Sequence, residues 1–261
     1  MILAVSIENT FISFGVFHQE ELVMDTKLTT NESRSVDEYA ILLSGMLAMN
    51  KITARSIDGA IISSVVRPLN DTLRRAVEKL TGICPLLLGP GIKTGLSIKT
   101  DFPSQLGGDI VANAVACSVF ARPPFVIVDF GTATTLTGID HKGELCGVVI
   151  CPGALSALSA LSAQAAELPR VAVDKPRDLF GKNTNDSMTS GIVYGHAAMV
   201  DGLLDRIAEA WDTDDLKVIA TGDLAEKILP YSKRNGKIVT EPHLTLTGLM
   251  RIYSLNSRNK S

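Results

Sequence analysis

A carboxylate at the end of a predicted strand, beside a turn, is the first chemical feature of this chain. Asp129 follows the apolar run Phe125-Val-Ile-Val128 and precedes Phe-Gly-Thr, so its side chain is expected at the end of a strand. Hard cations prefer oxygen ligands, and successive backbone N–H groups in such a turn can bind a phosphate chain. The segment therefore predicts a cation site next to a phosphate-binding turn.

A second carboxylate, Asp109, follows two glycines at the head of an apolar segment that is expected to be helical. Glycines at this place let the backbone and a ligand approach closely. Aspartate is also favoured as the N-cap of a helix. The residues alone leave both roles open for Asp109.

The chain carries an internal echo of the segment around Asp129. Leu3-Ala-Val-Ser-Ile-Glu-Asn-Thr10 resembles Val126-Ile-Val-Asp-Phe-Gly-Thr-Ala133, because both run from an apolar strand through a small polar turn into a second apolar strand. Two similar halves built around such hairpins would bind a nucleotide in the cleft between them. We place the halves at residues 1–120 and 121–255, followed by a tail at 256–261.

Strands and helices are predicted to alternate along the chain, which favours an α/β fold. Ser35 and Glu38 form the pattern of a capping box that opens a helix. The other expected elements are strands over 2–7, 11–17, 59–66 and 217–222 and helices over 69–80, 191–211 and 246–253.

The charge of the chain is balanced, with 25 basic and 28 acidic side chains and a net charge of −3. Without a run of like charge, neither a nucleic-acid nor a membrane-surface partner is expected. The apolar start has no basic region and no small-residue cleavage site, so we expect a cytoplasmic protein. A small molecule or another protein is the expected partner.

An ordered set of short motifs resembles the type III pantothenate kinase family over nearly the whole chain. They include Ile62-Ser-Ser-Val-Val66, Gly89-Pro-Gly-Ile-Lys-Thr-Gly95, Gly107-Gly-Asp109, Val128-Asp-Phe-Gly-Thr-Ala-Thr-Thr135, Pro152-Gly153, Gly181-Lys-Asn-Thr184 and Ala220-Thr-Gly222. The resemblance implies the fold of the actin, sugar kinase and heat-shock ATPase superfamily, with two ribonuclease-H-like halves and ATP in the cleft between the lobes. It also implies a homodimer, pantothenate as substrate, Mg²⁺, and a monovalent cation such as K⁺ or NH₄⁺.

The resemblance carries roles over to individual residues. Asp109 matches the general base, and Asp129 matches the ligand of the monovalent cation. Thr132 would then offer its hydroxyl and backbone to ATP. Thr184 matches a position that contacts pantothenate, although a cap at the start of the following helix would also explain it.

The first phosphate motif departs from the family pattern Asp-x-Gly-Asn-Thr. Here the segment reads Ser6-Ile-Glu8-Asn9-Thr10, so only Asn9 and Thr10 are retained. Serine brings no charge to Mg²⁺, and Glu8 adds bulk and negative charge where a polyphosphate should lie. Residues two apart on a strand face the same side, so Glu8 could instead reach the metal in place of the missing Asp.

The substrate side departs as well. In the motif Gly107-Gly108-Asp109-Ile110, Ile110 replaces an arginine that could pair with the carboxylate of pantothenate. Thr100 stands where an aromatic residue is usual. On the adenosine side, Asp223 replaces a glycine. Three functions remain possible: phosphorylation of pantothenate by ATP, a catalytically impaired paralogue kept for binding or regulation, and a kinase for another small hydroxyl compound.

Overall fold

The computed structural model describes residues 1–165 and 168–257, and the chain divides into two compact units. The first contains Met1–Phe120 together with the chain from His243 onward, and the second is Ala121–Pro242. The predicted end of the second half at residue 255 is wrong, because the last helix, α7 (Leu244–Ser257), belongs to the first unit.

Helix α7 joins the first unit because its apolar side chains pack against that unit's sheet. Leu246, Leu249 and Ile252 share a buried cluster with Ala4 and Ile61. The helix continues through Ser257, beyond the expected start of the tail, and residues 258–261 lie outside the described residues.

The sheet of the first unit has the strand order β3-β2-β1-β4-β5. Its strands are β1 (Ile2–Ile7), β2 (Phe11–His18), β3 (Glu21–Thr29), β4 (Gly59–Ser64) and β5 (Leu86–Leu87). β1 pairs antiparallel with β2 and parallel with β4. The structure confirms the strands expected at 2–7 and 11–17 and adds β3, which the sequence analysis missed.

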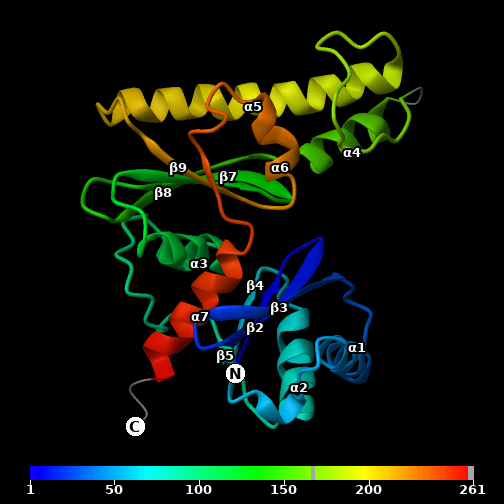
Figure 1. Ribbon diagram of the computed structural model, residues 1–261, viewed down its shortest axis with the longest axis vertical. Helices are drawn as coiled ribbons and strands as arrows, with labels where there is room; N and C mark the ends of the chain where they lie inside the picture. Colours follow the sequence, from blue (N-terminus) through cyan, green and yellow to red (C-terminus); the bar gives the residue numbers. More distant parts are fainter. Residues whose placement is uncertain (166–167, 258–261) are drawn as a thin grey trace. The chain divides into compact units, whose positions relative to one another are not determined.

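Helices cover both faces of this sheet (Figure 1). On one face, α1 (Val36–Met49) and α2 (Leu69–Thr81) bury Leu43 and Leu73 against Leu3 and Val5. On the other face lie α3 (Gly108–Cys117) and α7. The predicted capping box of α1 is confirmed, since Ser35 and Glu38 bond reciprocally to each other's backbone N–H.

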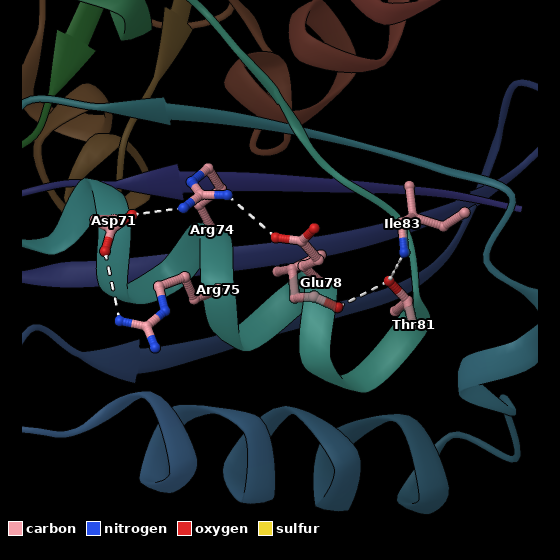
Figure 2. Close-up of polar contacts among 7 residues, drawn as sticks. Asp71, Arg74, Arg75, Glu78, Thr81 and Ile83 are labelled. Atoms are coloured by element: carbon pink, nitrogen blue, oxygen red, sulfur yellow. Dashed lines mark hydrogen bonds and ion pairs between the residues drawn. The ribbon is translucent and has the colours of Figure 1, made fainter.

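Figure 2 shows a row of charged side chains along the exposed side of α2. Arg74 lies between Asp71, at 2.6 Å, and Glu78, at 3.1 Å, and Arg75 pairs with Asp71 at 3.8 Å. Such exposed ion pairs contribute little to the stability of a protein. They support the helix locally, and burial of its apolar stripe accounts for its place on the sheet.

The second unit repeats this architecture. Its sheet has the order β10-β9-β6-β7-β8, built from β6 (Phe125–Phe130), β7 (Ala133–Ile139), β8 (Leu145–Pro152), β9 (Lys217–Thr221) and β10 (Val239–Thr240). Read in reverse, this is the order of the first sheet with β1 replaced by β6 and β4 by β9. The antiparallel hairpin β6–β7 and the parallel pair β6–β9 also match their counterparts. The echo in the sequence therefore corresponds to a repeated sheet.

Three helices pack on one face of the second sheet: α4 (Ala154–Gln164), α5 (Thr184–Ala210) and α6 (Ala225–Ile228) (Figure 1). Their apolar side chains cluster with Val126, Val128 and Phe130 of β6. The expected start of α5 near residue 191 is wrong. The helix begins at Thr184 because Asn183 accepts a hydrogen bond from the backbone N–H of Asp186 at 2.9 Å.

None of the helices in the described part of the chain is both long and apolar enough to cross a bilayer.

A buried carboxylate on α5 gives a direct test of what holds the second unit together. Asp201 is 5% exposed and accepts hydrogen bonds from Ser232 Oγ at 2.6 Å and from the Lys233 backbone N–H at 2.8 Å. Asp201→Ala leaves both donors without this acceptor, so we expect the free energy of unfolding to fall by about 3 kcal/mol. Asp205→Ala, one turn later, removes only an exposed pair with Arg234 and should cost less than about 1 kcal/mol.

Urea denaturation of the two variants measures the difference. Equal losses would contradict a structural role for the buried carboxylate.

Candidate active site

A row of serines crosses the first sheet at one end of its central strands. Ser6 on β1 pairs with Ser13 on β2 and with Ser63 on β4. Paired residues point to the same face, and Ala4 and Ile61, two residues earlier on their strands, belong to the cluster with α3 and α7. Ser6 and Ser63 therefore lie under α3, at the carboxyl ends of two parallel strands, where α/β sheets commonly bind ligands.

Glu8 lies directly after β1 and turns back toward Ser6. Ser6 is 1% exposed, and its Oγ donates to Glu8 Oε1 at 3.3 Å. The backbone of Glu8 is fixed on both sides, since its N–H donates to the Phe11 carbonyl at 2.9 Å and its carbonyl accepts from Thr30 Oγ1 at 2.6 Å. Asn9 and Thr10 form the exposed turn that follows.

The N-terminus of α3 approaches this end of the sheet through two glycines. A Cβ at Gly108 would overlap Ser63 Oγ, and a Cβ at Gly107 would overlap Asp109 Oδ1. The N-cap is Gly107, so the alternative in which Asp109 caps the helix is wrong: Asp109 is the second helical residue. A side chain at either glycine would have to displace one of these polar atoms.

The Asp109 carboxylate lies in an unusual electrostatic environment. Its Oδ1 atom is buried and has no hydrogen-bond partner among the residues that the structure describes. Loss of water raises the pKa of Asp109, and the backbone N–H groups of Ile110 and of Asp109 itself oppose that shift only in part. A carboxylate with a raised pKa and one buried oxygen without a hydrogen-bond partner has the properties of a proton acceptor.

Two further candidates belong to the first unit. Thr100 is partly buried and its Oγ1 has no hydrogen-bond partner in the described part of the chain. Ile110 follows Asp109 on α3 and is partly buried. The Thr100 hydroxyl therefore makes no hydrogen bond to Asp109.

In the second unit, Asp129 occupies a narrow slot. It lies on β6 between Val128 and Phe130, so it points to the face opposite the helices. A Cβ at Gly222 would lie 2.5 Å from Asp129 Oδ1, and one at Gly131 would lie 3.4 Å from the same atom. The carboxylate is thus bounded by two glycines, and Gly222 has a positive φ of +93° that side chains rarely adopt.

The turn with Thr132 rests on residues whose roles the sequence did not reveal. Ser156 Oγ donates to the Thr132 carbonyl at 2.7 Å, and a Cβ at Gly153 would overlap the same carbonyl. His196 Nε2 lies 3.2 Å from the Pro152 carbonyl and so connects α5 to this support. In the sequence, only the Pro-Gly pair at 152–153 pointed to residues that support this turn. Ser156 and His196 lie too far along the chain to be linked to the turn by spacing.

Thr184 is separate from these residues. It is exposed at the start of α5, whose helix packs on the face of the second sheet opposite Asp129. The expectation that Thr184 caps this helix is wrong, because the cap is Asn183. The described contacts bring Asp129 and Gly131 together in the second unit, and bring Ser6 and Glu8 together in the first.

Solved structures share the fold of this chain at low sequence identity. A putative Baf family transcriptional activator from Campylobacter jejuni is 19% identical, with a TM-score of 0.59 and coverage of 98% of this chain and 99% of that one. A ROK hexokinase from Thermus thermophilus is 16% identical, with a TM-score of 0.51 and coverage of 98% and 99%. Together with the repeated sheets, these similarities confirm the fold of the actin, sugar kinase and heat-shock ATPase superfamily.

Curated relatives are much more similar in sequence. A type III pantothenate kinase from Geobacter sulfurreducens is 41% identical over 98% of this chain and 99% of its own length. Another from Halalkalibacterium halodurans is 41% identical over 98% of this chain and all of its own length. The profile of the type III pantothenate kinases matches residues 2–206. The chain therefore belongs to the type III pantothenate kinase family.

Proposed function

We propose that this protein transfers the γ-phosphoryl group of ATP to the hydroxyl of pantothenate, giving 4′-phosphopantothenate, the entry step to coenzyme A. The observation that carries the proposal is the 41% identity to type III pantothenate kinases along nearly the whole chain. The buried, unpaired Oδ1 of Asp109 supports it, because the reaction needs a proton acceptor beside the attacking hydroxyl.

Asp109 is the general base in this proposal. As the hydroxyl oxygen of pantothenate forms its bond to the γ-phosphorus, the bond from that phosphorus to the β–γ bridging oxygen breaks and ADP leaves. The proton of the hydroxyl passes to the Asp109 carboxylate. Burial assists this step because the raised pKa of Asp109 makes it a stronger base than an exposed aspartate.

The remaining site residues are assigned to phosphate and cation. Asp129 would hold a monovalent cation, K⁺ or NH₄⁺, and its carboxylate oxygen in a slot between two glycines fits such a hard ion. Mg²⁺ would reduce the negative charge on the ATP phosphates. Asn9, Thr10 and Thr132 lie in exposed turns after the first strand of each hairpin, where their backbone N–H groups can face phosphate oxygens.

Substrate binding is assigned to Thr100, Gly107, Gly108, Ile110 and Thr184. Because Ile110 cannot form a forked ion pair with a carboxylate, another donor must bind that end of pantothenate, or the affinity for it is low. D-Pantothenol, whose carboxylate is replaced by a hydroxymethyl group, is therefore an informative second substrate.

We further propose that the protein is a homodimer and acts in the cytoplasm. The support for association is the exposure of large apolar side chains on the second unit, where Ile150 is 69% exposed on the edge strand β8 and Leu155 is 45% exposed on α4. A contact with a second copy would remove such side chains from water. Sedimentation equilibrium would test the dimer, and a monomer across the micromolar range would contradict it.

The activity is tested by ADP release from the purified protein with ATP, pantothenate, Mg²⁺ and K⁺ or NH₄⁺. We expect release to require pantothenate. Release with pantothenol but not with pantothenate would identify a kinase for substrates without a carboxylate. No release above that of an Asp109→Asn control would favour a catalytically impaired paralogue.

A further inference from the structure

The corresponding hairpins β1–β2 and β6–β7 carry a carboxylate at different positions. In the matching sheets, Ser6 and Asp129 both occupy the penultimate position of the first strand. Each pairs with a hydroxyl residue on the parallel neighbour, Ser63 for Ser6 and Thr221 for Asp129. The second unit thus has a carboxylate at a position where the first unit has only a hydroxyl.

Glu8 returns a carboxylate to the vacant place in the first hairpin. It stands at the position that corresponds to Gly131, and its side chain turns back along the strand until Oε1 is 3.3 Å from Ser6 Oγ. The Oγ of a serine occupies nearly the place that the carboxyl carbon of an aspartate would occupy. The Glu8 carboxylate therefore lies close to the place in the first hairpin that corresponds to the Asp129 carboxylate in the second.

The surroundings of the pair belong to the candidate site and not to the general surface. Ser63, which pairs with Ser6, contacts Gly108 at the start of α3, next to Asp109. Two backbone hydrogen bonds fix the main chain of Glu8 beside Ser6. The contact between Ser6 Oγ and Glu8 Oε1, at 3.3 Å, is long for a hydroxyl and a carboxylate, so Ser6 competes only weakly with a cation for this oxygen.

We propose that Ser6 and Glu8 form a composite site for the divalent cation of ATP, in which Glu8 supplies the carboxylate oxygen and Ser6 positions it. The inference rests on the proposed ATP-dependent function. Mg²⁺ is usually held by one or two protein carboxylates together with phosphate oxygens, and a single glutamate beside a hydroxyl fits that requirement. Glu8 then binds the cation that accompanies the triphosphate and does not obstruct it.

The proposal predicts an effect whose sign depends on the metal. With a divalent cation present, the Glu8 carboxylate attracts the metal–nucleotide complex, so Glu8→Gln weakens binding. Without the cation, the same carboxylate repels the bare triphosphate, so Glu8→Gln leaves binding unchanged or tightens it. A glutamate that simply obstructs the site would make Glu8→Gln tighten binding under both conditions.

The experiment measures the dissociation constant of AMP-PNP, a non-hydrolysable ATP analogue, for the full chain by calorimetric titration with Mg²⁺ and with EDTA. The ratio of the dissociation constant in EDTA to that in Mg²⁺ measures how strongly binding depends on the metal. We expect Glu8→Gln to reduce this ratio by about tenfold or more, and Ser6→Ala to reduce it by about tenfold. Mn²⁺ binding followed by electron paramagnetic resonance in the presence of AMP-PNP should weaken in parallel. Glu20→Gln, an exposed change in the turn between β2 and β3, should leave the ratio unchanged.

Each outcome has a distinct meaning. A parent protein that binds AMP-PNP under neither condition would overturn both the proposed function and this inference. A parent that binds it with Mg²⁺, and whose ratio is unaffected by Glu8→Gln, would overturn the inference alone. The double change Ser6→Asp with Glu8→Gly moves the carboxylate back to the strand and should keep the Mg²⁺ dependence, whereas Glu8→Gly alone should lose it.

Discussion

Asp109→Asn is expected to abolish pantothenate-dependent ADP release and, at the same time, to raise the melting temperature. Loss of a positioned general base typically costs 10²–10⁴-fold in rate. At neutral pH the fold buries a carboxylate oxygen without a partner, which is unfavourable, and the neutral amide removes the charge. Kinetics and thermal unfolding of the same preparation measure both effects.

The control for Asp109→Asn is Asp37→Asn on α1, where the carboxylate is exposed and pairs with Lys79 at 2.7 Å. This change should leave turnover within about twofold and should not raise the melting temperature, because only an exposed ion pair is lost. If Asp109→Asn retained full turnover, its role as base would be wrong. If it lowered the melting temperature by several degrees, the buried carboxylate would instead be structurally required.

The raised pKa of Asp109 also gives the pH dependence a definite sign. The base must be ionised, so kcat/KM should fall as pH decreases through the raised pKa, at a higher pH than an ordinary aspartate would give. For stability the sign is opposite. The folded state holds the proton more tightly than the unfolded state, so this group's contribution to stability is present below its unfolded pKa and is lost as pH rises through the folded pKa. The Asn variant should lack both dependences.

Gly222→Ala is expected to reduce activity more than 100-fold and to lower the free energy of unfolding by at least about 3 kcal/mol. The backbone there has a φ of +93°, and a new Cβ would lie 2.5 Å from Asp129 Oδ1 and 2.6 Å from backbone atoms of Phe130. Strand β6 cannot yield without breaking its ladder, so the carboxylate in the slot must move.

Gly236→Ala is the matched control for this change. Gly236 has a similar φ of +81°, but no atom lies within 4 Å of the added Cβ. Gly236→Ala should therefore lower the free energy of unfolding only by the strain of a Cβ at positive φ, about 1–2 kcal/mol, and should retain turnover. Equal effects of the two substitutions on activity would show that the slot around Asp129 is not used. Urea denaturation and ADP release measure both quantities.

Local patterns in the sequence predicted the fold well where a nearby side chain determines the structure. Ser35 and Glu38 interact only three residues apart, so their capping box could be predicted and was confirmed. The start of α5 was missed because a polar first turn capped by Asn183 hides the apolar periodicity. The last helix was assigned to the wrong unit because its apolar face fits any sheet, and only the folded chain identifies the partner.

For the candidate site, the sequence identified the carboxylates but not their surroundings. The local context of Asp109 and Asp129 together with the family resemblance predicts their roles, and the structure adds the unpaired oxygen of the first and the slot of the second. Ser156 and His196 support the Thr132 turn from other elements, and a linear sequence does not contain that proximity. The contact of Ser6 with Glu8 depends on a side chain turning back, which strand periodicity permits but does not require.

The return of α7 to the first unit makes the second unit an insertion within the first. During synthesis, α7 leaves the ribosome after all of Ala121–Pro242. Until then, the face of the first sheet that carries Ala4 and Ile61 is covered by α3 but lacks α7, while every strand and helix of the second unit has already been made. The N-terminal unit should therefore be the last to reach its native state, and a nascent chain stalled before His243 should present an apolar surface for chaperones to bind.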